Sequence, residues 1–84
     1  MKVTTTDKKP PRSQHLRFNV EVERETDGRW IAEIPEVPGA LAYGETEEQA
    51  INKAYAIALR AVADDVEECR QEPPTSISLE RVIA

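Results

Sequence analysis

The sequence predicts a single α+β domain of order β-β-β-α-β, in which one long helix covers one face of a small antiparallel sheet. Three observations lead to this fold class. The chain has 84 residues, the size of one small domain. Two runs of alternating apolar and polar residues are joined by a turn at 26–28. Further along the chain, over 47–70, apolar residues recur at intervals of three and four.

The first predicted strand begins at Leu16. From there apolar and polar residues alternate strictly, the pattern of a half-buried strand. One side carries Leu16, Phe18, Val20 and Val22, and the other carries Arg17, Asn19, Glu21 and Glu23. A second alternating run, 30–34, follows the turn sequence Thr26-Asp27-Gly28 and ends at Pro35, so the two runs predict a hairpin.

The register of this hairpin follows from the rule that directly opposed residues share a face. A two-residue loop would place Val22 opposite Glu33, with a charge facing the intended core. A three-residue loop, 26–28, places Val22 opposite Ala32 and aligns the apolar faces. That loop needs a left-handed residue in its last position, so Gly28 is expected to have a positive φ.

The rest of the chain predicts a third strand, a helix and a fourth strand. Pro38-Gly39 marks a turn into a short strand over 40–43, and Pro35 ends the preceding ladder. Thr46 lies three residues before Gln49, the spacing of a capping box, so a helix is expected over 47–70. Its apolar stripe comprises Ile51, Ala54, Tyr55, Ala58, Val62, Val66 and Cys69. Pro73-Pro74 ends the helix, its last turns are expected to overhang the sheet, and 76–84 reads as the fourth strand.

Charge is distributed unevenly along the chain, whose net charge is −5. Residues 1–14 hold four Lys/Arg against one Asp, for a net charge of +3, and are expected to be a disordered basic tail. Residues 15–84, the predicted domain, hold seven Lys/Arg against fifteen Asp/Glu, for a net charge of −8. An acidic body repels phosphate backbones and attracts basic proteins.

Several functional classes are disfavoured by what the sequence lacks. It contains no run of 18 apolar residues and no apolar stretch near the N-terminus, so we expect a cytoplasmic protein. The single cysteine, Cys69, cannot form an internal disulfide, and with the single histidine, His15, it does not make a zinc site. His15 stands alone at the edge of a strand and Cys69 lies near a helix C-terminus, where a thiolate is not favoured. We therefore expect no enzyme activity and no cofactor.

The row of carboxylates on the first strand has two readings. Glu21, Glu23 and Glu25 project from one face and could bind a divalent ion together with Glu48 or Glu80. Alternation alone also produces such a row on a solvated face, which is the commoner case. We therefore expect no metal site.

Two stretches of turn and strand residues resemble a known family. The first contains Glu25, Asp27, Gly28, Trp30, Ala32, Pro35, Pro38 and Gly39, and the second contains Gly44, Glu45, Thr46, Glu48 and Ala50. In order and spacing they resemble the N-terminal domain of HicB-type antitoxins, over residues 16–82. The resemblance implies a partial ribonuclease-H-like fold in which Gly28, Trp30, Pro35, Pro38, Gly39, Gly44 and Thr46 are structural residues.

The same resemblance implies a function. HicB-type domains block a small basic toxin, HicA, that cleaves messenger RNA, and they usually carry a C-terminal DNA-binding segment. Beyond Pro73-Pro74 this sequence has room for one strand, so direct DNA binding is not expected. The predicted function is a non-enzymatic module that covers the RNA-binding surface of a basic toxin. The expected contacts are Glu21, Glu23, Glu33 and Glu36.

Two other functions remain open at this point. One is a stand-alone homo-oligomer with another protein partner. The other is a reduced metal-dependent nuclease in which Glu21, Glu48 and Glu80 would hold ions about 4 Å apart. Self-association, most simply as a twofold dimer, is expected through free sheet edges or the outer helix face. Ile31 lies on the uncovered sheet face and Ile57 lies off the helix stripe, so both are expected to contribute.

Overall fold

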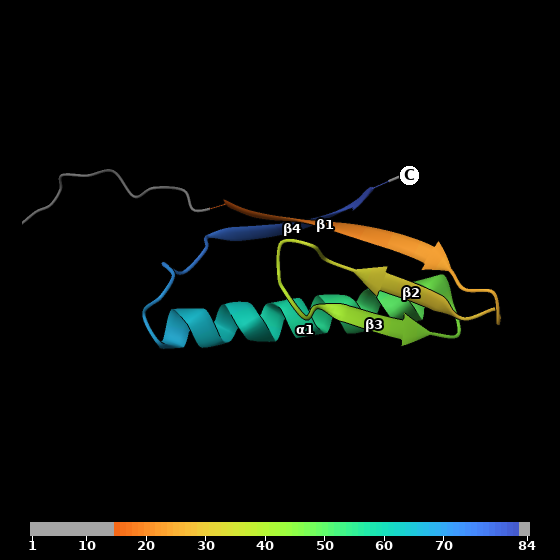
Figure 1. The fold of residues 1–84 in the computed structure, drawn as a ribbon. Helices are drawn as coiled ribbons and strands as arrows, with labels where there is room; N and C mark the ends of the chain where they lie inside the picture. Colours follow the sequence, from red (N-terminus) through yellow and green to blue (C-terminus); the bar gives the residue numbers. More distant parts are fainter. Residues whose placement is uncertain (1–14, 83–84) are drawn as a thin grey trace, which may run out of the picture.

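The computed structural model describes residues 15–82 as a four-stranded mixed sheet with one helix packed on one face (Figure 1). The strands are β1 (His15–Arg24), β2 (Trp30–Glu33), β3 (Leu41–Gly44) and β4 (Ser76–Val82), and the helix is α1 (Glu47–Glu67). The strand order is β3-β2-β1-β4, which confirms the predicted β-β-β-α-β order. The expected basic tail, 1–14, and residues 83–84 lie outside the described residues.

The hairpin between β1 and β2 has the predicted register. Val22 is opposite Ala32, and Arg24 is opposite Trp30. The loop is closed by hydrogen bonds from Glu25 N–H to the Arg29 carbonyl (2.7 Å) and from Gly28 N–H to the Glu25 carbonyl (3.0 Å). Gly28 has φ +92°, so the predicted left-handed residue at the end of the three-residue loop is confirmed.

The fourth strand corrects the expectation of an antiparallel sheet, because β4 pairs with β1 in parallel. The sheet order makes β3 parallel to β1, since each is antiparallel to β2. The helix then carries the chain from one end of the sheet back to the other, as in any crossover between parallel strands. A strand following such a helix runs in the direction of β3, and therefore of β1.

The start of α1 follows from the predicted cap. Thr46 Oγ1 accepts a hydrogen bond from Gln49 N–H at 3.0 Å, and Gln49 Oε1 accepts one from Glu45 N–H at 2.8 Å. Glu47 and Glu48 occupy the first turn, where the positive end of the helix dipole favours carboxylates. The predicted first helical residue, Glu47, is confirmed.

Small side chains bring α1 close to the sheet. Its fully buried residues recur every fourth position: Ala50, Ala54, Ala58 and Val62. The predicted stripe omitted Ala50, whose backbone approaches buried Gly44 so closely that a Cβ on Gly44 would lie 2.5 Å from Ala50 N. The larger members of the predicted stripe, Ile51, Tyr55 and Val66, are half-buried beside this line. The core is completed by Phe18, Val20, Ala32, Ile34 and Ala40.

The helix ends at Glu67, three residues before the predicted boundary. Cys69 has φ +61°, a left-handed conformation that stops the helix. Cys69 N–H bonds the Val66 carbonyl at 3.0 Å and Arg70 N–H bonds the Asp65 carbonyl at 2.7 Å, the pattern of a Schellman motif. Cys69 is exposed, so its assignment to the apolar stripe was wrong.

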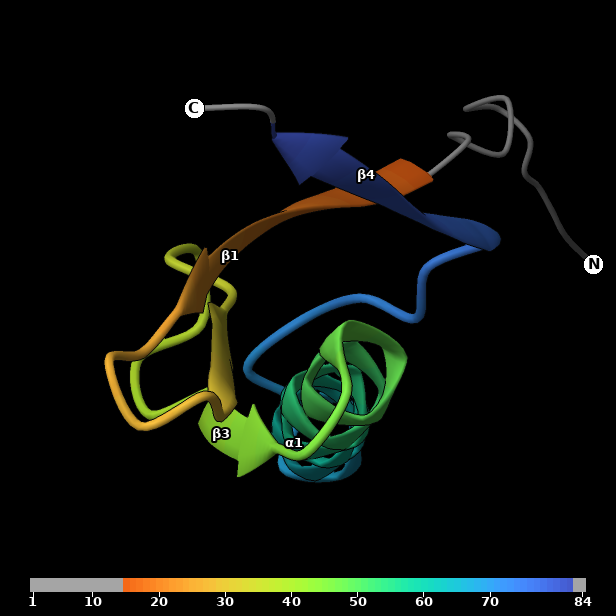
Figure 2. The same cartoon turned by 90° about the vertical axis from the view of Figure 1, so that its right-hand side faces the viewer.

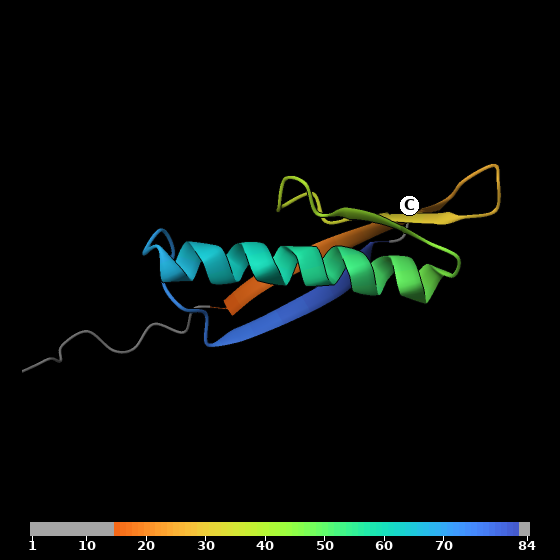
Figure 3. The same ribbon diagram turned by 90° about the horizontal axis from the view of Figure 1, so that it is seen from below.

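The helix covers the sheet unequally. It packs on β1, β2 and β3, while β4 lies at the far side of the sheet (Figure 2) and meets α1 through the ion pair between Arg81 and Glu47. Seen from below, β1 and β4 cross α1 at an angle, and the C-terminal half of the helix extends past β3 (Figure 3). This part of the helix lies near Leu16 and Phe18 at the start of β1, so it overhangs β3 and not, as the sequence had led us to expect, the sheet as a whole. Within the described residues, no helix meets the length and apolarity required to cross a membrane.

Candidate protein-binding face

The fold leaves open the face of the sheet that is turned away from α1, and we call it the outer face. Strand alternation and register place there the odd-numbered residues of β1, β2 and β3 and the even-numbered residues of β4. It is polar at one end, around the start of β1 and β4. At the other end, where β1 pairs with β2, it is acidic and apolar.

A shallow depression lies at the acidic end, and we call it the acidic hollow. Its lining residues are Glu21, Val22, Glu23, Ile31, Glu33 and Val82. Three strands bring them together: Glu21 is opposite Glu33 on β2 and opposite Val82 on β4, while Glu23 is opposite Ile31. Three of the four expected contact residues thus surround one apolar floor.

The carboxylates of the acidic hollow have no basic partner within the described part of the chain. Among residues 15–82, no ion pair involves Glu21, Glu23 or Glu33. Like charges directly opposite each other on neighbouring strands are destabilising, and Glu21 faces Glu33 in this way. The fold therefore retains a local repulsion that a bound cation would relieve.

Apolar side chains continue from the hollow across β2 and β3. Leu41, Tyr43 and Val82 are each 40% exposed, and Tyr43 is opposite Ile31. Arg29 stacks over the Tyr43 ring, 4.4 Å from its centroid, and also binds Asp27. These bonds from the Arg29 N–H and guanidinium lower the pKa of Asp27. Apolar area surrounded by charge is characteristic of a protein-binding surface.

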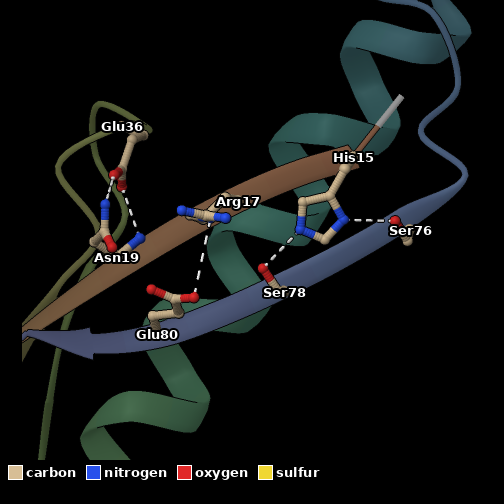
Figure 4. Close-up of polar contacts among 7 residues, drawn as sticks. All are labelled: His15, Arg17, Asn19, Glu36, Ser76, Ser78 and Glu80. Atoms are coloured by element: carbon tan, nitrogen blue, oxygen red, sulfur yellow. Dashed lines mark hydrogen bonds and ion pairs between the residues drawn. The ribbon is translucent and has the colours of Figure 1, made fainter. Parts of the chain in front are cut away.

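Glu36, the fourth expected contact, lies outside the acidic hollow. Its carboxylate accepts hydrogen bonds from Asn19 N–H (3.1 Å) and from Asn19 Nδ2 (2.6 Å), as Figure 4 shows. Partial desolvation acts to raise the pKa of Glu36, but these bonds outweigh it, so the pKa lies below the ordinary value of 4.5. Glu36 covers an open part of the β1 edge, at the point where β2 has already ended.

His15 is not alone, contrary to the expectation from the sequence. Its Nδ1 lies 2.6 Å from Ser76 Oγ and its Nε2 lies 3.0 Å from Ser78 Oγ, so it links β1 to β4 (Figure 4). All three side chains lie on the outer face, and His15 lines none of the principal hollows of the described chain. The contact joins the two parallel strands. It was not visible in the sequence because 61 residues separate His15 from Ser76.

Two further expectations are corrected by the placement of side chains. Ile57 was expected to lack an intramolecular partner, but it is half-buried and packs against the core. The carboxylates Glu21, Glu48 and Glu80 do not form a cluster, because Glu48 belongs to α1 while the other two lie on the outer face. In the described part of the chain, no three potential ligands are grouped to hold a metal ion.

Comparisons with known proteins gave no match to a family model, to a curated protein or to a solved structure.

Proposed function

We propose that this chain is a non-enzymatic, antitoxin-like module that binds a small basic protein of the HicA type and covers its RNA-binding surface. Binding takes place on the outer face, centred on the acidic hollow. The carboxylates of Glu21, Glu23 and Glu33 contact basic side chains that would otherwise hold phosphates. Ile31, Leu41 and Tyr43 contribute the apolar part of the interface.

One observation carries this proposal: three carboxylates with no ion-pair partner among residues 15–82 surround an apolar floor on an uncovered sheet face. A basic partner gains charge-assisted contacts there and removes the repulsion between Glu21 and Glu33. Electrostatic attraction accelerates association, while apolar contacts slow dissociation. The resemblance to HicB-type domains independently supports a basic, RNA-cleaving partner.

The test uses a purified HicA-type toxin, a small basic protein that cleaves messenger RNA, with affinity measured by calorimetry and toxin activity by cleavage of a messenger RNA. We expect the wild-type chain to bind and to stop cleavage. Glu21→Lys and Glu33→Lys should each weaken binding by about tenfold or more and restore cleavage, because each reverses a charge at the centre of the contact. Affinity should also fall as salt concentration rises.

A matched control makes the same charge change elsewhere. Glu67 lies exposed in the last turn of α1, remote from the outer face, where a lysine also suits the helix dipole. Glu67→Lys should therefore retain wild-type affinity, apart from a small general effect of net charge. Equal weakening by all three variants would show that net charge alone attracts the partner and would contradict binding at the acidic hollow.

A further inference from the structure

Among residues 15–82, the open edge of β4 is the longest strand edge left unpaired. β4 has seven residues, all of which pair with β1 on one side, and it ends the sheet on the other. Ile77 and Leu79 point to the helix side of the sheet but are only half-buried, because α1 packs on β1, β2 and β3. An exposed strand edge of this length is a template for pairing with another strand.

The pairing of β1 determines which residues of β4 point their backbone N–H and C=O groups to the open edge. Asn19 N–H points away from β4, towards Glu36, so the even-numbered residues of β1 direct their backbone groups at β4. In a parallel ladder, each of these β1 residues forms backbone hydrogen bonds with the two residues that flank its register partner on β4. Leu16, opposite Ile77, therefore bonds Ser76 and Ser78, and the backbone groups of Ile77, Leu79 and Arg81 point to the open edge.

We infer that a second copy of this chain pairs with this edge, so that two β4 strands run antiparallel about a twofold axis at Leu79. Leu79 then faces its own symmetry mate, and Ile77 faces Arg81 of the other copy. This is the register in which all seven residues of β4 are paired and all three outward-pointing residues exchange backbone bonds. The two sheets become one continuous sheet with both helices on the same side.

The charges along β4 favour this register. Ser78 comes to lie opposite Glu80 of the second copy, and on the other side of Ser78 lies Arg17 of β1. Within one chain Arg17 already lies 4.0 Å from Glu80. In the dimer, two arginines and two glutamates alternate across the junction, and no like charges are directly opposed. A shift that placed Glu80 opposite its own symmetry mate would lose this complementarity.

This interface is separate from the proposed partner site. Pairing takes place in the plane of the sheet along the edge of β4, whereas a basic partner would dock on the outer face at the acidic hollow, which β4 reaches only through Val82 at its end. The inference therefore does not depend on the proposed function, and it assigns self-association to β4 in place of Ile31 and Ile57.

Sedimentation of the full chain, with reductant present because Cys69 is exposed, tests the inference. The wild-type chain should be a dimer at micromolar concentration. Ser78→Glu should raise the dimer dissociation constant by about tenfold, because it creates two like-charge pairs with Glu80. Ser78→Lys, which removes the same contact with His15, should keep the dimer or strengthen it.

A rescue variant completes the test. Ser78→Glu combined with Glu80→Lys restores opposite charges across the junction and should restore dimerisation. A monomeric wild-type chain, or equal weakening by Ser78→Glu and Ser78→Lys, would overturn the proposed pairing. Within each chain, Ser78→Glu places a carboxylate beside Arg17, which should stabilise the fold. The same substitution should destabilise the dimer, so a loss of dimer would not come from unfolding.

Discussion

At the scale of single residues, Gly28 and Gly44 are required for different physical reasons. Gly28 has φ +92°, and a Cβ added there would meet no atom within 4 Å, so a side chain would suffer backbone strain alone. Gly44 has an ordinary φ, but its Cβ would lie 2.5 Å from the backbone of Ala50, where β3 meets α1. At Gly44, the backbones of β3 and α1 cannot move apart without disturbing the core that they enclose.

We expect Gly44→Ala to lower the free energy of unfolding by about 2 kcal/mol or more, because the helix must move away from the sheet. Gly28→Ala should cost about 1–2 kcal/mol, the penalty of a left-handed conformation. Gly28→Asn should cost less, since asparagine tolerates that conformation. Urea unfolding of the three variants measures these values. Equal costs for Gly28→Ala and Gly28→Asn would contradict the assignment to backbone strain.

Cys69 occupies the left-handed position of the Schellman motif, where glycine is the usual residue. Cys69→Gly should therefore raise the free energy of unfolding by about 0.5–1 kcal/mol, because glycine adopts this conformation without a Cβ penalty. Cys69→Ala, which also removes the thiol but keeps the Cβ, should give no such gain. Thermal unfolding under reducing conditions distinguishes the two, and an equal gain in both variants would point to the thiol.

At the scale of elements, the loop between β2 and β3 stabilises the edge of β1 through Glu36. Its lowered pKa means that the ionised form is favoured in the folded state. The resulting stabilisation is complete above the ordinary pKa of 4.5 and is lost as the pH falls through the lower folded value. Glu36→Gln should cost about 1 kcal/mol at neutral pH, a value reduced by solvent exposure, and progressively less below pH 4.5.

Glu33→Gln, on β2, should stabilise the fold, whereas Glu36→Gln should destabilise it. Glu33 faces Glu21, and no basic residue of the described chain pairs with either, so neutralising Glu33 should stabilise the fold by a few tenths of a kcal/mol at low salt. The gain should shrink at high salt, because screening already reduces the repulsion. The same variant should weaken binding to a basic partner. A loss of stability in Glu33→Gln would show that the hollow is not under electrostatic repulsion.

At the scale of the whole molecule, the position of the carboxylates argues against metal-dependent nucleic-acid cleavage. Glu21 and Glu80 lie on the outer face while Glu48 belongs to the helix, and a net charge of −5 repels a phosphate backbone. We expect no cleavage of RNA or DNA by the purified chain with Mg²⁺ or Mn²⁺. Cleavage that requires metal and disappears in Glu21→Gln would instead favour the nuclease function.

The elements and one register were predictable because they depend on near neighbours. Alternation around Val20 defines the faces of β1, the turn residues before Gly28 define the hairpin, and Thr46 with Gln49 defines the start of α1. Each of these features involves residues within a few positions of one another or across one tight turn. The helix end was misplaced because Cys69 is not the residue that usually adopts a left-handed conformation.

The candidate site was predictable only in part. Alternation alone identified Glu21, Glu23 and Glu33 as outward-facing carboxylates, and the hairpin register places Glu21 beside Glu33. Nothing in the sequence indicated that Val82 would complete the same hollow, or that Glu36 would turn to Asn19 instead. Both depend on how distant segments pack.

The sequence by itself determined the order of the strands and the helix, where the helix begins, which strand faces are apolar, and how the first hairpin pairs. Only the tertiary structure decided that β4 lies parallel to β1, that Gly44 must admit the backbone of Ala50, and that His15 meets Ser76 and Ser78. The physical reason is separation along the chain. Local pattern and turn chemistry act over a few residues, whereas these contacts join segments that are brought together when α1 packs on the sheet and returns the chain to its far edge.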